Sequence, residues 1–149
     1  MKVYETSIPE YGIKKMDSDV KKVKIRSSAD IYKYVMQFYG DDIDVYESFF
    51  MVTLNRANNT TGYVKISQGG TFSTIVDIKI IAKYAIDSLC GNVIIFHNHP
   101  SGNLEPSNSD NDMTKKVQEA LELFEINVLD HLIIGSEGYY SYADSGKLK

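Results

Sequence analysis

The residues best able to do chemistry lie in one polar stretch that follows an apolar run. His97 and His99 stand two positions apart, with Asn98 between them. In an extended chain, side chains i and i+2 project to the same side, so both imidazoles can converge on one metal ion while Asn98 points away. The pair alone is equally compatible with surface or packed histidines.

A carboxylate follows the histidines at Asp110. Ser107 and Asp110 have the spacing of a helix capping box. Without the histidines, capping alone would explain why both residues are there. The two interpretations are partly compatible, because Ser107 as N-cap would project Asp110 toward the loop that holds His97 and His99. Two neutral imidazoles and one carboxylate would leave a tetrahedral Zn²⁺ with one open position, which is typical of catalytic zinc.

The elements that must position these residues follow from hydrophobic periodicity. Their mixed order predicts an α/β fold, with a mixed sheet flanked by helices. We expect a helix over 27–40, strands at 49–54 and 63–66 joined by a turn at 58–59, a helix over 78–89, a strand at 93–96, a loop over 97–107, a helix with Val117, Ala120, Leu121 and Phe124 on one face, and strands at 128–134 and 139–142.

Length, charge and cysteine content limit the class of protein. The chain has 149 residues, 43% of them hydrophobic and 24% charged, which fits one globular domain. A net charge of -4 argues against a dedicated nucleic-acid binder. One cysteine, Cys90, excludes an intramolecular disulfide framework and a four-cysteine zinc cluster. With no apolar leader and no membrane-length apolar run, we expect a cytoplasmic protein with no membrane partner.

Residues 1–26 are expected to form an N-terminal extension that includes an edge strand around Val20 to Ile25. Basic residues in this segment have two interpretations. Lysines on an exposed edge protect a strand from unwanted pairing. The same charges could contact nucleic acid, in which case the binding would be weak and sensitive to salt. The basic residues are Lys21, Lys22, Lys24 and Arg26.

Two local patterns carry a family resemblance. His97-x-His99-Pro, followed after six residues by Ser107-x-x-Asp110, resembles the JAMM (JAB) metalloprotease signature. The string HNHPSG at 97–102 and the string LDHLIIG at 129–135 resemble the bacterial RadC family more specifically. The likeness extends from about residue 27 to 148. RadC proteins of fuller length carry an N-terminal helix-hairpin-helix region, for which this sequence has no room, so a short form is expected.

The resemblance implies a three-layer fold, similar to that of JAMM proteins and cytidine deaminases, over residues 27–149. It also implies one Zn²⁺ per chain, with His97, His99 and Asp110 as ligands. Glu47, directly before the strand at 49–54, matches the family's upstream glutamate, and it would deprotonate the attacking water. Ser107 would stabilise the developing oxyanion. The substrate would be a peptide or protein, cleaved at a peptide or isopeptide bond.

Several alternatives stay open at this point. From sequence alone, Glu47 reads as a solvated strand end. The same metal site could serve DNA-repair chemistry on a phosphodiester, or it could stabilise a module that only binds other proteins. His131, in an apolar strand, is expected to be structural or to support a ligand, and Asp130 could orient a ligand histidine through its ring N–H. The oligomeric state is not predicted.

Overall fold

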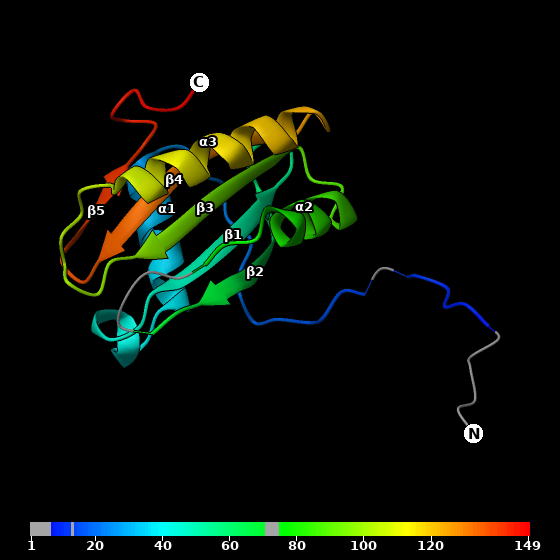
Figure 1. Cartoon of the computed structure of the whole chain (residues 1–149), viewed down its shortest axis with the longest axis horizontal. Coiled ribbons are helices and arrows are strands. Elements are labelled where there is room, and N and C mark those ends of the chain that lie inside the picture. Colours follow the sequence, from blue (N-terminus) through cyan, green and yellow to red (C-terminus); the bar gives the residue numbers. More distant parts are fainter. Residues whose placement is uncertain (1–6, 13, 71–74) are drawn as a thin grey trace.

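The computed structural model describes residues 7–12, 14–70 and 75–149. Figure 1 shows the arrangement of their helices and strands. In chain order these are α1 (Ser28–Val35), the 3-10 turns η1 (Met36–Phe38) and η2 (Asp41–Asp44), β1 (Ser48–Leu54), β2 (Thr60–Gln68), α2 (Ile78–Asp87), β3 (Asn92–Asn98), α3 (Asn108–Glu122), β4 (Asn127–Gly135) and β5 (Gly138–Ser141).

The strands form one mixed sheet in the order β2-β1-β3-β4-β5. β3 and β4 are parallel and are connected through α3, whereas the other neighbouring strands are antiparallel. Helix α1 covers one face of the sheet, and α2 and α3 cover the other (Figure 1). The predicted mixed sheet with flanking helices is therefore confirmed, in three layers.

Side-chain alternation along the strands divides the apolar residues between two cores. In β3, Ile94 and Phe96 pack on the side of α1, while Val93 and Ile95 pack on the side of α2 and α3. The same alternation places His97 on the α2 and α3 side, next to Phe49 of β1. The first histidine therefore lies on the face that α3 covers.

Several predicted boundaries were wrong, and the helix expected over 27–40 already ends at Val35. β3 continues through Asn98, because His97 still pairs with Phe49 and Ile133, so the polar loop begins only at His99. Helix α2 ends at Asp87, and Leu89 has a φ of 52° and is 85% exposed. Phe124 lies beyond the end of α3 and is 54% exposed, so it does not share the buried face of Val117.

The predicted edge strand around Val20 to Ile25 was also wrong in extent. Among the described residues, this segment has one antiparallel bridge, between Lys24 and Asn59. Ile25 is nevertheless buried, and its amide donates to the carbonyl of Asn58. The buried Ile25 side chain and hydrogen bonds between Val23 and Thr60 therefore hold this segment, without a ladder of strand pairing.

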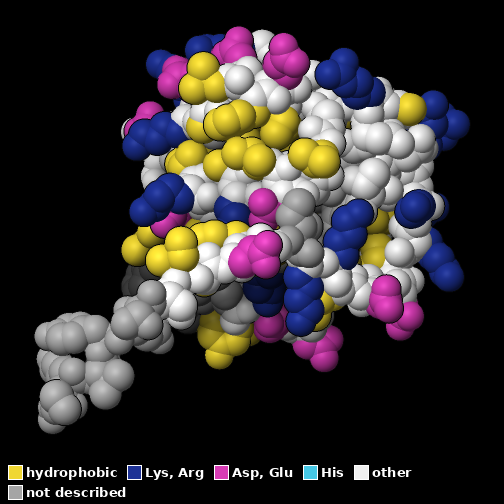
Figure 2. All heavy atoms as spheres, turned by 90° about the vertical axis from the view of Figure 1, so that its right-hand side faces the viewer, with side chains coloured by type: hydrophobic (Ala, Val, Ile, Leu, Met, Phe, Trp, Pro, Cys, Tyr) yellow, Lys and Arg dark blue, Asp and Glu magenta, His cyan; other side chains and the backbone are white. Residues whose placement is uncertain are grey.

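Apolar side chains also reach the surface outside the two cores. On the face in Figure 2, hydrophobic side chains gather where α2 and the end of α3 meet the solvent. The exposed apolar residues of these elements include Ile80 and Tyr84 of α2 and Leu123, which directly follows α3. No helix within the described ranges has both the length and the apolar character that crossing a bilayer requires.

Candidate metal centre

Four side chains from three separate parts of the fold meet at the C-terminal end of β3, the central strand of the sheet. His97 is the penultimate residue of β3 and His99 follows the strand. Asp110 lies in the first turn of α3, and Glu47 directly precedes β1. His97 and Glu47 are buried, at 2% and 7% exposure, so the interpretation of Glu47 as a solvated strand end was wrong. His99 and Asp110 are partly exposed.

The donor atoms of the two histidines and Asp110 lie close together. The two Nε2 atoms are 3.0 Å apart. Asp110 Oδ1 lies 3.2 Å from His97 Nε2, and Asp110 Oδ2 lies 3.2 Å from His99 Nε2. Tetrahedral zinc with Zn–N distances of about 2.0–2.1 Å places neighbouring donor atoms about 3.3 Å apart. The spacing of these donors therefore fits one small metal ion.

Two carboxylates face the histidine pair, and they differ in distance. Glu47, His97 and His99 each offer a donor atom within 4.8 Å of the others, as in a possible metal site. Glu47 Oε1 is 4.0 Å from His99 Nε2, however, whereas Asp110 lies 3.2 Å from both histidines. The closer carboxylate is the better candidate ligand. Glu47 lies beside the histidine pair but farther from His99 than Asp110 does.

The capping box at the start of α3 orients Asp110. The Ser107 hydroxyl accepts a hydrogen bond from the Asp110 amide at 3.0 Å, and Asp110 Oδ2 accepts one from the Ser107 amide at 2.9 Å. The same carboxylate faces His97 and His99. The cap and the metal-facing position therefore coexist in one residue. The Ser107 hydroxyl still carries its own hydrogen, which it can donate.

Opposite charges perturb the pKa values at this site. Burial alone would raise the pKa of Asp110, but hydrogen bonds from His97 and His99 outweigh burial and hold that pKa well below its usual range. Burial alone would lower the pKa of His99. Its contacts with Asp110, the Asn103 carbonyl and the charge of Glu47 instead raise that pKa above 6.5. The carboxylates of Asp110 and Glu47 therefore stabilise positive charge on His99, and the histidines stabilise the negative charge of Asp110.

A chain of hydrogen bonds behind His97 fixes the tautomer of its neutral ring, with the hydrogen on Nδ1. The Thr114 hydroxyl donates to the Asp110 carbonyl at 2.7 Å, so it accepts from His131 Nδ1–H at 2.6 Å. Burial, and next the charge of His97, hold the pKa of His131 well below its usual range, so its Nε2 carries a lone pair. His97 Nδ1–H donates to that atom at 2.8 Å. Neutral His97 then presents a bare Nε2 to the site.

A single hydrogen bond fixes the tautomer of neutral His99 in the same way. Its Nδ1 lies 2.6 Å from the carbonyl oxygen of Asn103, which can only accept, so Nδ1 carries the hydrogen. When His99 is neutral, its Nε2 also has a free lone pair. A ring N–H bound to a carbonyl or another polar group commonly fixes a metal-binding histidine in this way. The donor set therefore fits a zinc ion in chemistry as well as in spacing.

Asp130 does not orient a ligand histidine, contrary to the hypothesis from sequence. Its carboxylate accepts from the Ser141 hydroxyl at 2.6 Å and from the backbone amides of His131 and Ala143. These bonds hold the chain after β5, where the ring of Tyr142 stacks on His131 with centroids 4.7 Å apart. Asp130 thus shapes the pocket around His131 without contacting its ring nitrogens.

Sequence reasoning missed Thr114, Asn103 and the role of Asn98. Thr114 had a usable signal, because it lies four residues after Asp110 and so on the same side of α3. Asn103 contributes only a backbone carbonyl, which carries no sequence signal. Asn98 was expected to point away from the histidines, and it does, with a side chain that is completely buried.

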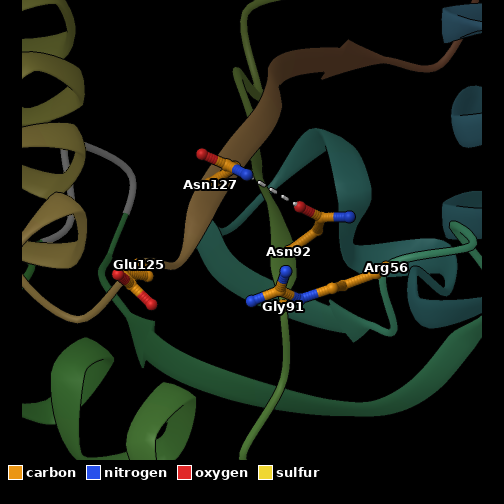
Figure 3. Close-up of a pocket in the computed structure, with 5 residues that line it drawn as sticks. All are labelled: Arg56, Gly91, Asn92, Glu125 and Asn127. Carbon is orange, nitrogen blue, oxygen red and sulfur yellow. Dashed lines mark hydrogen bonds between the residues drawn. The ribbon is translucent and has the colours of Figure 1, made fainter.

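A separate polar depression of about 520 Å³ lies at the other end of β3 (Figure 3). It is lined by Arg56, Gly91, Asn92, Glu125 and Asn127. Arg56 packs over Gly91, where an added Cβ would lie 2.7 Å from Arg56 Cγ. Asn127 donates to the Asn92 side chain at 3.3 Å. None of the four residues at the histidine site takes part in it.

Comparison with known proteins supports the resemblance read from the motifs. A family model described as "RadC-like JAB domain" matches residues 25–147. A UPF0758 protein of Flavobacterium johnsoniae is 36% identical over 138 residues, covering 92% of this chain and 59% of that protein. A UPF0758 protein of Chlorobium phaeovibrioides is 33% identical over 125 residues, covering 84% and 55%.

The match covers nearly all of this chain but only part of each relative. The chain spans a little over half the length of these two curated relatives. The matched region includes all four residues at the histidine site. The chain therefore belongs to the RadC family and contains its RadC-like JAB domain.

Proposed function

We propose that this domain is a zinc-dependent hydrolase of the JAMM metallopeptidase type, which cleaves a peptide or isopeptide bond. One observation carries the proposal: the Nε2 atoms of two histidines and the carboxylate oxygens of Asp110 lie 3.0 to 3.2 Å apart, with Glu47 beside them. When bound, a zinc ion would supply Lewis acidity, which makes water nucleophilic near neutral pH.

The residues of the chain divide the remaining work. His97, His99 and Asp110 would hold the ion. Glu47, 4.0 Å from His99, would take a proton from the attacking water and return it to the leaving amine. Ser107 would donate its hydroxyl hydrogen to the carbonyl oxygen as negative charge develops there. A module that only binds other proteins has no use for a buried carboxylate at this position.

The proposal is tested by metal analysis of the purified protein together with turnover assays on peptide, isopeptide and DNA substrates. We expect about one zinc per chain and cleavage of an amide bond. Cleavage of DNA alone would instead support metal-assisted phosphodiester hydrolysis. One zinc per chain without turnover of any substrate would support a metal-stabilised interaction module. We expect nucleic acid to bind weakly or not at all.

Zinc affinity should fall as the pH falls, starting at a higher pH than for an ordinary histidine. His99 must lose its proton to coordinate, and its pKa is raised above 6.5, so protons compete with zinc up to that higher pH. Calorimetry in buffers of different ionisation enthalpy would measure the protons released. Glu47→Gln removes one charge that raises this pKa and should shift the dependence to lower pH. An affinity that stays constant from pH 8 to pH 6 would contradict the prediction.

Removing the hydrogen-bond chain behind His97 should weaken zinc binding by about 10- to 100-fold. His131→Leu removes the acceptor for His97 Nδ1–H, and Thr114→Val removes the acceptor for His131. Leu132→Ala is the matched control, because Leu132 is the next residue of β4 and packs in the core on the opposite face. Competition with a chelating dye measures the affinity. Unchanged affinity in both His131→Leu and Thr114→Val would overturn the prediction.

A further inference from the structure

Asn98 connects the histidine motif to the segment that carries Glu47. Its side chain is fully buried and faces away from His97 and His99. Asn98 Oδ1 accepts from the Ser48 amide at 2.8 Å. Asn98 Nδ2 donates to the carbonyls of Ile43 and Tyr46 at 2.7 and 2.8 Å. All three bonds therefore reach residues 43–48.

The register of the sheet explains this arrangement. β1 and β3 pair antiparallel, with Phe49 opposite His97, so the next position places Ser48 opposite Asn98. The ladder stops there, and the Asn98 amide group replaces backbone pairing. Tyr46 and Ser48 are both bonded to Asn98, and Glu47 lies between them. One side chain thus fixes the backbone on both sides of the glutamate.

Other contacts also hold the segment before β1: the Tyr39 hydroxyl donates to the Ser48 carbonyl at 3.2 Å, and the Glu47 amide donates to the Gly70 carbonyl at 3.4 Å. η2 ends at Asp44, and Val45 and Tyr46 are 45% and 42% exposed. The Glu47 carbonyl accepts a hydrogen bond from the Gly69 amide at 2.9 Å. Asn98 therefore supplies the attachment to β3, and Gly69 supplies the attachment to the end of β2.

We propose that Asn98 is the positioning residue that holds Glu47 at the histidine pair; its effect on turnover rests on the proposed function. An error of about 1 Å in the position of a catalytic group can lower the rate about 10²-fold. Asn98→Ala should therefore lower kcat by about 10²-fold and leave KM within about threefold. Zinc should stay at about one per chain, because the ligands are retained.

Two measurements test the proposal, one of them without a substrate. In Asn98→Ala, hydrogen exchange at the Gly69 amide should quicken at least tenfold, because Gly69 bonds to Glu47 and not to Asn98. In the Glu47→Gln background, adding Asn98→Ala should cost less than about threefold in kcat, because Asn98 acts through Glu47. If Asn98→Ala does not fold, Asn98→Leu has nearly the same shape and removes the donors and the acceptor without burying a charge.

Asn92→Ala is the matched control. Asn92 is a buried asparagine at the other end of β3, and its amide donates to Asn55 and Asn58. It should leave Gly69 exchange and kcat at parent values. Unchanged Gly69 exchange in Asn98→Ala would overturn the proposal whether or not a substrate is known, as would equal kcat losses in the two backgrounds. Faster exchange with unchanged kcat would instead remove Glu47 from the proposed mechanism and leave the positioning by Asn98 intact.

Discussion

Glu47→Gln should keep the zinc and the fold while lowering turnover by about 10²- to 10⁴-fold, the usual loss when a positioned general base is removed. The amide nearly matches the carboxylate in shape, so the packing of this buried residue should be preserved. An amide does not accept a proton at neutral pH. Glu47 is also the more distant carboxylate, 4.0 Å from His99, so its neutralisation should leave the three proposed ligands in place.

Zinc content and kcat, measured on the same preparation, check this result. Glu105→Gln is the matched control, because it makes the same change at an exposed glutamate in the loop between His99 and Ser107. It should turn over at the parent rate. If Glu47→Gln with zinc in place hydrolysed a confirmed substrate at the parent rate, either another residue would be the base or the domain would not be a hydrolase of this type.

The fold was predictable because short continuous apolar runs mark the central strands β1 and β3, whereas apolar residues recur at helical spacing in the helices. The boundaries were less predictable, because they depend on pairing partners. His97 and Asn98 look like loop residues by polarity, yet Phe49 and Ile134 extend the ladder to include them. Leu89 continues the apolar pattern of α2, but the chain leaves the helix there at a positive φ. Residue type alone does not indicate either outcome.

The candidate site was also predictable only in part. The spacing of His97 and His99 predicted their convergence directly, and helix capping placed Asp110 toward them. Glu47 lies 50 residues before His97 in the sequence, and its position became meaningful only through the family resemblance. Contacts such as that of Thr114 with His131 depend on how α3 packs on β4. No local pattern contains that information.

Variants that remove the proposed zinc ligands should have a different effect from the variant that removes only the helix cap. The double variant His97→Ala, His99→Ala should bind no zinc, because it loses two of the three proposed donors. Asp110→Asn should also lose affinity, since a neutral amide oxygen is a poorer zinc donor than a carboxylate. Ser107→Ala is the control for the cap: it removes the bond to the Asp110 amide and should cost about 0.5–2 kcal/mol of stability.

Metal analysis and thermal unfolding of these variants distinguish the two roles of Asp110. We expect Ser107→Ala to unfold at a lower temperature while retaining about one zinc per chain. Asp110→Asn should lose zinc even where its thermal stability stays close to that of the parent, because an asparagine oxygen can still accept from the Ser107 amide. Full retention of zinc in the double histidine variant would eliminate this metal site. Full retention in Asp110→Asn would make Asp110 a helix cap alone and leave Glu47 as the third ligand.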